Sequence, residues 1–201
     1  APGVEDVAVA RRTGYPVVMK MTSKTTSHKT DVGGVRVGIG SEEELREQYR
    51  DLVAKLTERG LIDGLEGVLI QEMVKSKREL VTGIATDPQF GPMVMFGLGG
   101  VFVEVLKDVA FRLAPLTDID AKDLVHSVKC VKLLEGARGF TPAQMDKVEE
   151  TLLRISQLAD RLKFVRELDI NPLMISDKDG EPIAVDARIA FDPEAAAAFA
   201  K

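Results

Sequence analysis

Near the start of the chain, one lysine and the loop after it have the chemistry of a phosphate-binding site. Lys20 lies in an apolar run, residues 16–21, where an ammonium group costs free energy unless its charge is matched. It is either a phosphate ligand or an edge-strand lysine that reaches solvent along its stem. The following loop, residues 22–34, is rich in hydroxyls and amines and ends with Gly33 and Gly34. Such a loop can offer amides and ammonium groups to a polyphosphate, although a polar hairpin loop has the same composition. The spacing of a Walker A loop is absent.

One of the two histidines, His28, lies in this loop. A neutral imidazole is a nucleophile that can accept a phosphoryl group. Lys24 and Lys29 flank it and could neutralise the incoming charge. A surface histidine without a role is the alternative. The second histidine, His126, lies in an expected helix, and we interpret it as structural.

Oxygen ligands gather near the end of the chain. Asp169 and Asn171 are two residues apart in a strand pattern, so they face the same side. Asp186 lies in the expected partner strand of a hairpin. Carboxylate and amide oxygens on neighbouring strands suit Mg²⁺, which binds one or two carboxylates together with phosphate oxygens. The alternative is a buried polar cluster closed by Arg188.

The elements that must position these side chains alternate between strands and helices, which predicts an α/β or α+β fold. Strands are expected at residues 16–21, 35–39, 68–74, 80–85, 93–96 and near 101–105, and a closing hairpin at residues 168–175 and 183–189. We expect residues 68–74 to pair with residues 80–85.

Three helices are expected between these strands. The first begins at Ser41, which forms a capping box with Glu44, and it ends at Gly60. The second covers about residues 120–134. The third begins at Thr141, with a capping box completed by Gln144, and has an apolar stripe at helical spacing.

Composition limits the class of protein. The 201 residues are 45% hydrophobic and 29% charged, with a net charge of −5, so a basic nucleic-acid-binding face is not expected. No apolar run approaches the roughly 20 residues that span a bilayer, so no membrane partner is expected. A single cysteine, Cys130, cannot form an internal disulfide, which is consistent with the cytoplasm.

The order of these motifs resembles the ATP-grasp domain of ADP-forming acyl-CoA synthetases. The matching stretches are GYPVVMK, HKTDVGGVRVG, VLIQEMV, the run DPQFGPMVMFGLGGVFVEVLKDVAFRLAPL, KLLEGARG, ELDINPL and AVDARI. This resemblance implies an ATP-grasp fold, with a first lobe at residues 1–74, a second at residues 75–201 and the nucleotide between them.

The resemblance also assigns roles. It implies that His28 is transiently phosphorylated, that Mg²⁺ is required, and that ATP or ADP is the substrate. The nucleotide ligands that it implies are Lys20, Lys29, Gly33, Gly34, Gln71, Glu72, Met73, Val74 and Glu79. The implied metal ligands are Asn171, Asp186 and Asp169.

The resemblance implies an acid–thiol ligase that needs a CoA-binding α subunit, or fused CoA-binding and ligase domains, and therefore a hetero-oligomer. Two alternatives remain open. One is a non-catalytic, synthetase-like regulatory domain of a protein acetyltransferase. The other is an ATP-grasp ligase that joins a carboxylate to an amine, which would not need a loop histidine.

Overall fold

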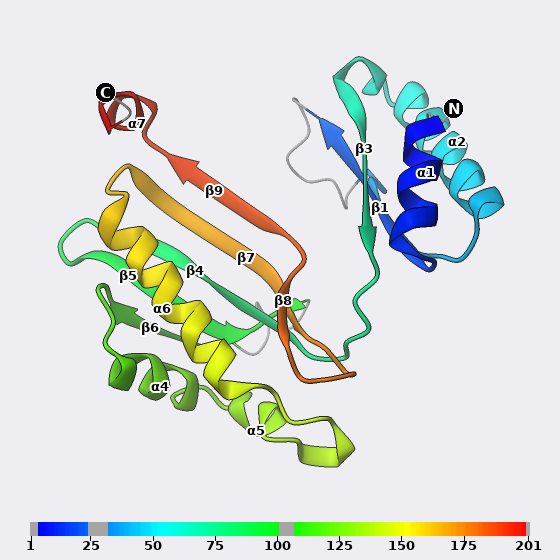
Figure 1. Ribbon diagram of the computed structural model, residues 1–201. Helices are drawn as coiled ribbons and strands as arrows, with labels where there is room; N and C mark the ends of the chain where they lie inside the picture. Colours follow the sequence, from blue (N-terminus) through cyan, green and yellow to red (C-terminus); the bar gives the residue numbers. More distant parts are fainter. Residues whose placement is uncertain (1–3, 24–31, 101–106, 200–201) are drawn as a thin grey trace. The chain divides into compact units, whose positions relative to one another are not determined.

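Groups of strands and groups of helices follow one another along the chain, and the strands form two separate sheets (Figure 1). The computed structural model describes residues 4–23, 32–100 and 107–199. The chain divides into two units, Ala1–Met73 and Val74–Lys201, and each has its own hydrophobic core. The mixture of helices with antiparallel sheets confirms the predicted α+β class.

The first unit has a three-stranded antiparallel sheet in the order β2-β1-β3. Its elements are α1 (Val4–Thr13), β1 (Val17–Ser23), β2 (Val35–Ile39), α2 (Glu42–Glu58), the short 3₁₀ helix η1 (Ile62–Gly64) and β3 (Leu65–Glu72). Met19 and Met21 of β1 pack with Leu45, Leu52 and Leu56 of α2, and all five side chains are almost fully buried. The sheet and α2 therefore share one core.

The ends of α2 follow the expected signals with one difference. The Ser41 hydroxyl accepts a hydrogen bond from the Glu44 amide at 3.2 Å, as a helix N-cap does. In the predicted capping box, the Glu44 carboxylate would accept a hydrogen bond from the Ser41 amide. It accepts instead from the amide of Gly40, the residue before Ser41, at 2.8 Å. Gly60 ends the helix with a φ of +66°, a left-handed conformation that glycine adopts without strain.

The second unit has a six-stranded antiparallel sheet in the order β6-β5-β4-β7-β8, and β9 also pairs with β7. Its strands are β4 (Glu79–Asp87), β5 (Gly91–Leu98), β6 (Val109–Leu113), β7 (Val165–Ile175), β8 (Pro182–Ala184) and β9 (Ala187–Phe191). Its helices are α4 (Asp118–His126), α5 (Val131–Leu134), the 3₁₀ helix η3 (Ala137–Gly139), α6 (Met145–Arg161) and α7 (Pro193–Phe199).

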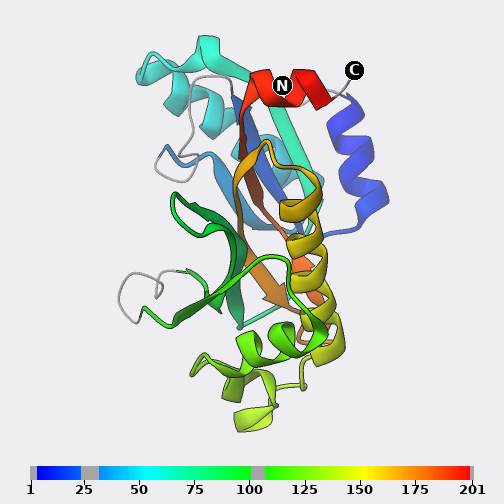
Figure 2. The same ribbon diagram turned by 90° about the vertical axis from the view of Figure 1, so that its left-hand side faces the viewer.

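Helix α6 packs along the sheet of this unit, and α4 lies beside it (Figures 1 and 2). The predicted apolar stripe of α6 is confirmed, because Val148, Leu152, Ile155 and Ala159 are all buried. They share a core with Phe96 and other buried side chains of β4, β5 and β7. One face of the sheet is therefore apolar and packed against helices.

The structure corrects the predicted pairing of residues 68–74 with residues 80–85. Strand β3 pairs with β1, whereas β4 pairs with β5 and β7, so the two segments belong to different sheets. The six residues between them form a connecting segment, residues 73–78, rather than a hairpin loop.

Two helix predictions also need correction. The expected helix at residues 120–134 is two helices, α4 and α5, and α4 begins with a capping box between Thr117 and Asp120. Helix α6 begins at Met145, not at Thr141. The Thr141 hydroxyl and the Gln144 side-chain amide donate instead to backbone oxygens of Asp177 and Asp179, at 2.9 and 3.0 Å.

The sequence patterns missed α1, β6 and α7, and the strand expected near residues 101–105 lies outside the described residues. Within residues 4–23, 32–100 and 107–199, no helix is both long and apolar enough to cross a bilayer.

Candidate functional site

The predicted closing hairpin is present, and the three candidate metal ligands lie on its neighbouring segments. Asp169 and Asn171 lie on β7, and Asp186 lies between β8 and β9, which both pair with β7. The two residues between β8 and β9 do not change the register against β7, since Leu173 pairs with Ala184 before them and Asp169 pairs with Arg188 after them. Continuing that register aligns Asn171 with Asp186. Side chains that are directly opposite on antiparallel strands point to the same face, so this register places the three side chains on one face of the sheet. The charge of Asp186 acts on the Asp169 carboxyl group, which agrees with this placement.

This cluster is at the surface, because Asp169, Asn171, Asp186 and Arg188 are all exposed. The alternative of a buried polar cluster closed by Arg188 is therefore wrong. Ligands at the surface remain accessible to a metal ion and to phosphate oxygens.

Electrostatics around Asp169 favour a bound cation. Partial burial raises the pKa of this carboxyl group above its usual value. Arg188 opposes that effect, whereas the negative charges of Asp186 and Glu167 add to it. A divalent cation beside two like-charged carboxylates would relieve their repulsion. Glu167 was not among the candidates, although its position two residues before Asp169 on the same strand would have indicated it.

A pocket of about 370 Å³ opens beside this cluster. Asp169, Glu167 and Arg188 line it together with the apolar side chains of Met95 and Ala85. An apolar surface next to charged groups is a common property of small-molecule sites. Across the described residues, no three His, Cys, Asp or Glu side chains form a metal site. The three candidates Asp169, Asn171 and Asp186 would supply two carboxylates and one amide, a set that suits Mg²⁺ when phosphate oxygens complete its coordination.

Lys20 lies on β1, the central strand of the first sheet, between Val35 of β2 and Leu69 of β3. Lys20 is only 9% exposed. The alternative of an edge-strand lysine reaching solvent is therefore wrong. Gly34 is next to this strand, because its carbonyl oxygen accepts a hydrogen bond from the Met21 amide at 2.8 Å.

Gly33, the preceding residue, has a φ of +67°, in the left-handed region that favours glycine. The structure thus brings Gly33 and Gly34 to the strand that carries Lys20. His28 and Lys29 lie outside the described residues.

The other candidate nucleotide ligands lie along the chain between the two sheets. Gln71 and Glu72 end β3, and Met73 and Val74 begin the connecting segment. Glu79 begins β4, where its carbonyl oxygen accepts from the Gly99 amide at 2.8 Å. A Cβ atom in place of Gly100 would meet the Glu79 carboxylate, which can rotate away, whereas the φ of +68° at this position favours glycine.

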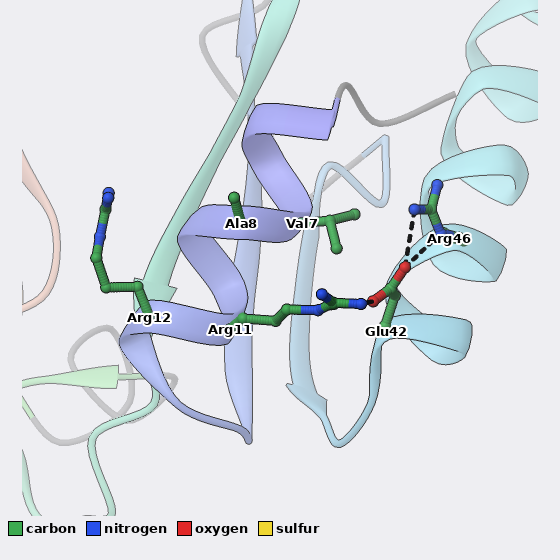
Figure 3. Close-up of a pocket in the computed structure, with 6 residues that line it drawn as sticks. All are labelled: Val7, Ala8, Arg11, Arg12, Glu42 and Arg46. Carbon is green, nitrogen blue, oxygen red and sulfur yellow. Dashed lines mark hydrogen bonds and ion pairs between the residues drawn. The ribbon is translucent and has the colours of Figure 1, made fainter.

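The sequence patterns did not indicate a second pocket, of about 480 Å³, between α1 and α2 (Figure 3). It is lined by Val7, Ala8, Arg11, Arg12, Glu42 and Arg46. Arg11 and Arg46 both donate to the Glu42 carboxylate, at 2.5 and 2.8 Å, whereas Arg12 points away from it (Figure 3). These hydrogen bonds lower the pKa of Glu42. Because Glu42 joins both helices, we assign this cluster a structural role.

The family model of the ATP-grasp domain matches residues 3–191. The chain therefore belongs to the ATP-grasp family. Within that family, its relatives include the β subunit of the ADP-forming acetate–CoA ligase I of Pyrococcus furiosus, which is 42% identical over 92% of this chain and 79% of the relative. The ADP-forming 4-hydroxybutyrate–CoA ligase of Nitrosopumilus maritimus is 43% identical over 92% of this chain. The chain spans only 26% of that longer protein.

Solved structures agree with this assignment. Acetyl-coenzyme A synthetase 1 of Ca. Korarchaeum cryptofilum, in complex with coenzyme A and Ca-AMPCP, matches with a TM-score of 0.85 and 42% identity. The match covers 94% of this chain and 81% of that chain. Another structure of that synthetase contains Mg-AMPPCP and a phosphohistidine segment that points towards the nucleotide site. The fold prediction is thereby confirmed.

Proposed function

We propose that this chain is the nucleotide-binding part of an ADP-forming acyl-CoA ligase, and that it transfers phosphate between a partner and ADP. The observation that carries the proposal is the cluster of Asp169, Asn171 and Asp186 on one hairpin, since this oxygen set suits a magnesium nucleotide. The relatives whose nucleotide complexes and phosphohistidine segment are described above support the same activity.

Each unit contributes its own groups to this function. In the first unit, Lys20 neutralises phosphate charge, and the amides near Gly33 and Gly34 donate to phosphate oxygens. In the second, Asp169, Asn171 and Asp186 would hold Mg²⁺, which neutralises phosphate charge and orients the phosphates. The segment from Gln71 to Val74 binds the adenine, and Glu79 binds the ribose. The domain boundary of this proposal is after Val74.

His28 is the phosphate carrier in the proposed reaction. Its imidazole nitrogen attacks the phosphorus of an acyl phosphate held by the partner, the acyl oxygen leaves as a carboxylate, and a phosphohistidine forms. A terminal phosphate oxygen of ADP then attacks this phosphorus, which yields ATP and restores the imidazole. These two steps convert acyl phosphate and ADP into the acid and ATP. On the partner, phosphate attacks the thioester carbon of acyl-CoA and CoA leaves as the thiol, so the whole sum is acyl-CoA, ADP and phosphate giving the acid, CoA and ATP.

The same proposal defines the partner and the compartment. Because a relative of this chain is the β subunit of an acetate–CoA ligase, we propose that a CoA-binding subunit or domain completes the reaction and forms a hetero-oligomer with this chain. The cytoplasm is the proposed compartment, because the single cysteine would stay reduced there.

Radiolabelling tests the phosphate carrier directly. The chain is incubated with γ-labelled ATP and Mg²⁺, and the bound label is tested for the acid lability and base stability of a phosphohistidine. His28→Ala should abolish the label. His126→Ala is the matched control, because His126 is the only other histidine and is exposed on α4. If His28→Ala is labelled as fully as the parent, His28 is not the carrier. If the parent binds nucleotide and is never labelled, the phosphate-carrier proposal is refuted in favour of the two alternatives, a regulatory domain or a carboxylate–amine ligase, neither of which needs a phosphorylated histidine.

A further inference from the structure

Arg78, the last residue of the connecting segment, is an unusually buried cation. It is only 3% exposed. Its Nη1 donates to the Leu133 carbonyl oxygen at 3.3 Å, and its guanidinium lies 5.2 Å from the centre of the Phe140 ring. Burial lowers the pKa of Arg78, and the negative charge of Asp177 opposes that shift.

Arg78 and Asp177 both have buried polar atoms that make no hydrogen bond within the described part of the chain. Among the described residues, Nε and Nη2 of Arg78 have no hydrogen-bond partner, and neither does Oδ1 of Asp177. All three atoms are buried. A buried guanidinium and a buried carboxylate each cost several kcal/mol unless they are paired. The donors and the acceptor are complementary but make no direct hydrogen bond with each other, so a single water between them would satisfy both residues.

The backbone around the pair ties the connecting segment to β7. The Asp177 amide donates to the Lys75 carbonyl oxygen at 3.0 Å, and the Ile175 amide donates to the Arg78 carbonyl oxygen at 3.1 Å. The Ser76 hydroxyl lies 2.7 Å from the Ile175 carbonyl oxygen and 2.9 Å from that of Arg78. Arg78 and Asp177 therefore belong to one junction between the segment and the strand.

The two sides of this junction carry different parts of the proposed nucleotide site. Val74, assigned to the base, lies in the segment, and Glu79, assigned to the ribose, directly follows it. Asp169 and Asn171, assigned to the metal, are on β7. We propose that Arg78, acting with Asp177, is a positioning residue that fixes the base-binding segment relative to the metal-binding strand. This inference rests on the proposed function.

The test compares two ligands of the full chain, Mg-ADP and magnesium pyrophosphate, by calorimetry. Pyrophosphate lacks the base and ribose, so its affinity should not depend on the position of the connecting segment. Arg78→Met should weaken Mg-ADP binding on the order of tenfold, because the segment that contacts the base and ribose is then no longer preorganised for binding. Magnesium pyrophosphate binding should change less than about twofold. Arg78→Lys, which keeps the charge but not the planar fork, should recover only part of the affinity.

A double-mutant cycle and a stability control complete the design. Asp177→Asn should weaken Mg-ADP binding as Arg78→Met does, and the double variant should be no weaker than either single variant. Ile155→Ala, in the α6 core away from the junction, serves as the control for lost stability.

Several results would overturn the inference. These are equal weakening of both ligands by Arg78→Met, additive losses in the cycle, or the same loss of Mg-ADP affinity in Ile155→Ala. Failure of the parent chain to bind Mg-ADP would instead refute the proposed function, and the inference with it.

Discussion

Replacing Gly83 with alanine should distort the strand that carries Asp169. Gly83 is in β4 and pairs with Asp169 of β7. A Cβ atom at Gly83 would lie 1.8 Å from the Leu168 carbonyl oxygen and 3.2 Å from the Asp169 Cα atom. Both neighbours are backbone atoms, which cannot rotate away.

The size of the effect follows from these distances. To reach an ordinary contact of 3.4 Å, the two strands must separate locally by about 1.6 Å, which is a third of the usual spacing of about 4.8 Å between paired strands. Overpacking of this kind costs about 2–3 kcal/mol. For a chain of this length, we expect the midpoint of thermal unfolding to fall by about 4–12 °C.

Calorimetry of Gly83→Ala and of a matched glycine variant checks this expectation. Gly40→Ala is the control, because its Cβ would meet only the Glu44 carboxylate at 3.5 Å, an ordinary contact. We expect its midpoint to stay within about 1 °C of the parent, as for an unstrained surface change. Because β7 also carries the metal cluster, Gly83→Ala should weaken Mg-ADP binding as well. A midpoint for Gly83→Ala that matches that of Gly40→Ala would refute the reasoning.

Three further predictions concern individual side chains. Asp186→Asn should lower the affinity for Mg-ADP on the order of tenfold without changing that for ADP in EDTA, and an equal effect in both conditions would contradict a metal role. Hydrogen bonds from Arg46 and Arg11 lower the pKa of Glu42 in the folded chain. The ionised Glu42 side chain therefore stabilises the fold fully above the ordinary carboxyl pKa, and this stabilisation is lost as the pH falls through the lowered pKa. Urea unfolding at decreasing pH should show this loss in the parent and not in Glu42→Gln, and identical profiles would argue against it. Burial and the nearby Asp108 raise the pKa of Cys130 to about 12, so a thiol reagent at pH 8 should label it only after unfolding, and rapid labelling of the folded chain would show that it is not buried.

The hairpin and its oxygen cluster could be predicted because the signals are local. Two apolar alternating segments around the turn at Gly180 leave few other pairings, and strand periodicity then places Asp169 and Asn171 on one face. The exposure of this cluster was not predictable, since it depends on which face of the sheet the helices cover. The burial of Lys20 was ambiguous for the same reason, because the central position of β1 is set by pairing with β2 and with the distant β3.

Long-range contacts explain the predictions that were wrong. The polar residues 75–78 look like a hairpin loop between two apolar segments, yet they cross from one sheet to another and are held by Ile175 and Asp177. Thr141 and Gln144 have the spacing of a capping box, but hydrogen bonds to Asp177 and Asp179 use their side chains elsewhere. Local spacing does not reveal such competing partners.

The central place of β1 has a consequence for how Lys20 meets a ligand. Because hydrogen-bonded strands flank it on both sides, its Cα atom has little freedom to move towards or away from an anion. Any adjustment is limited to the torsions of the four-carbon stem, most of which the surrounding protein already restricts. Association with an anion would then cost little additional side-chain entropy, so more of the attraction would remain as affinity.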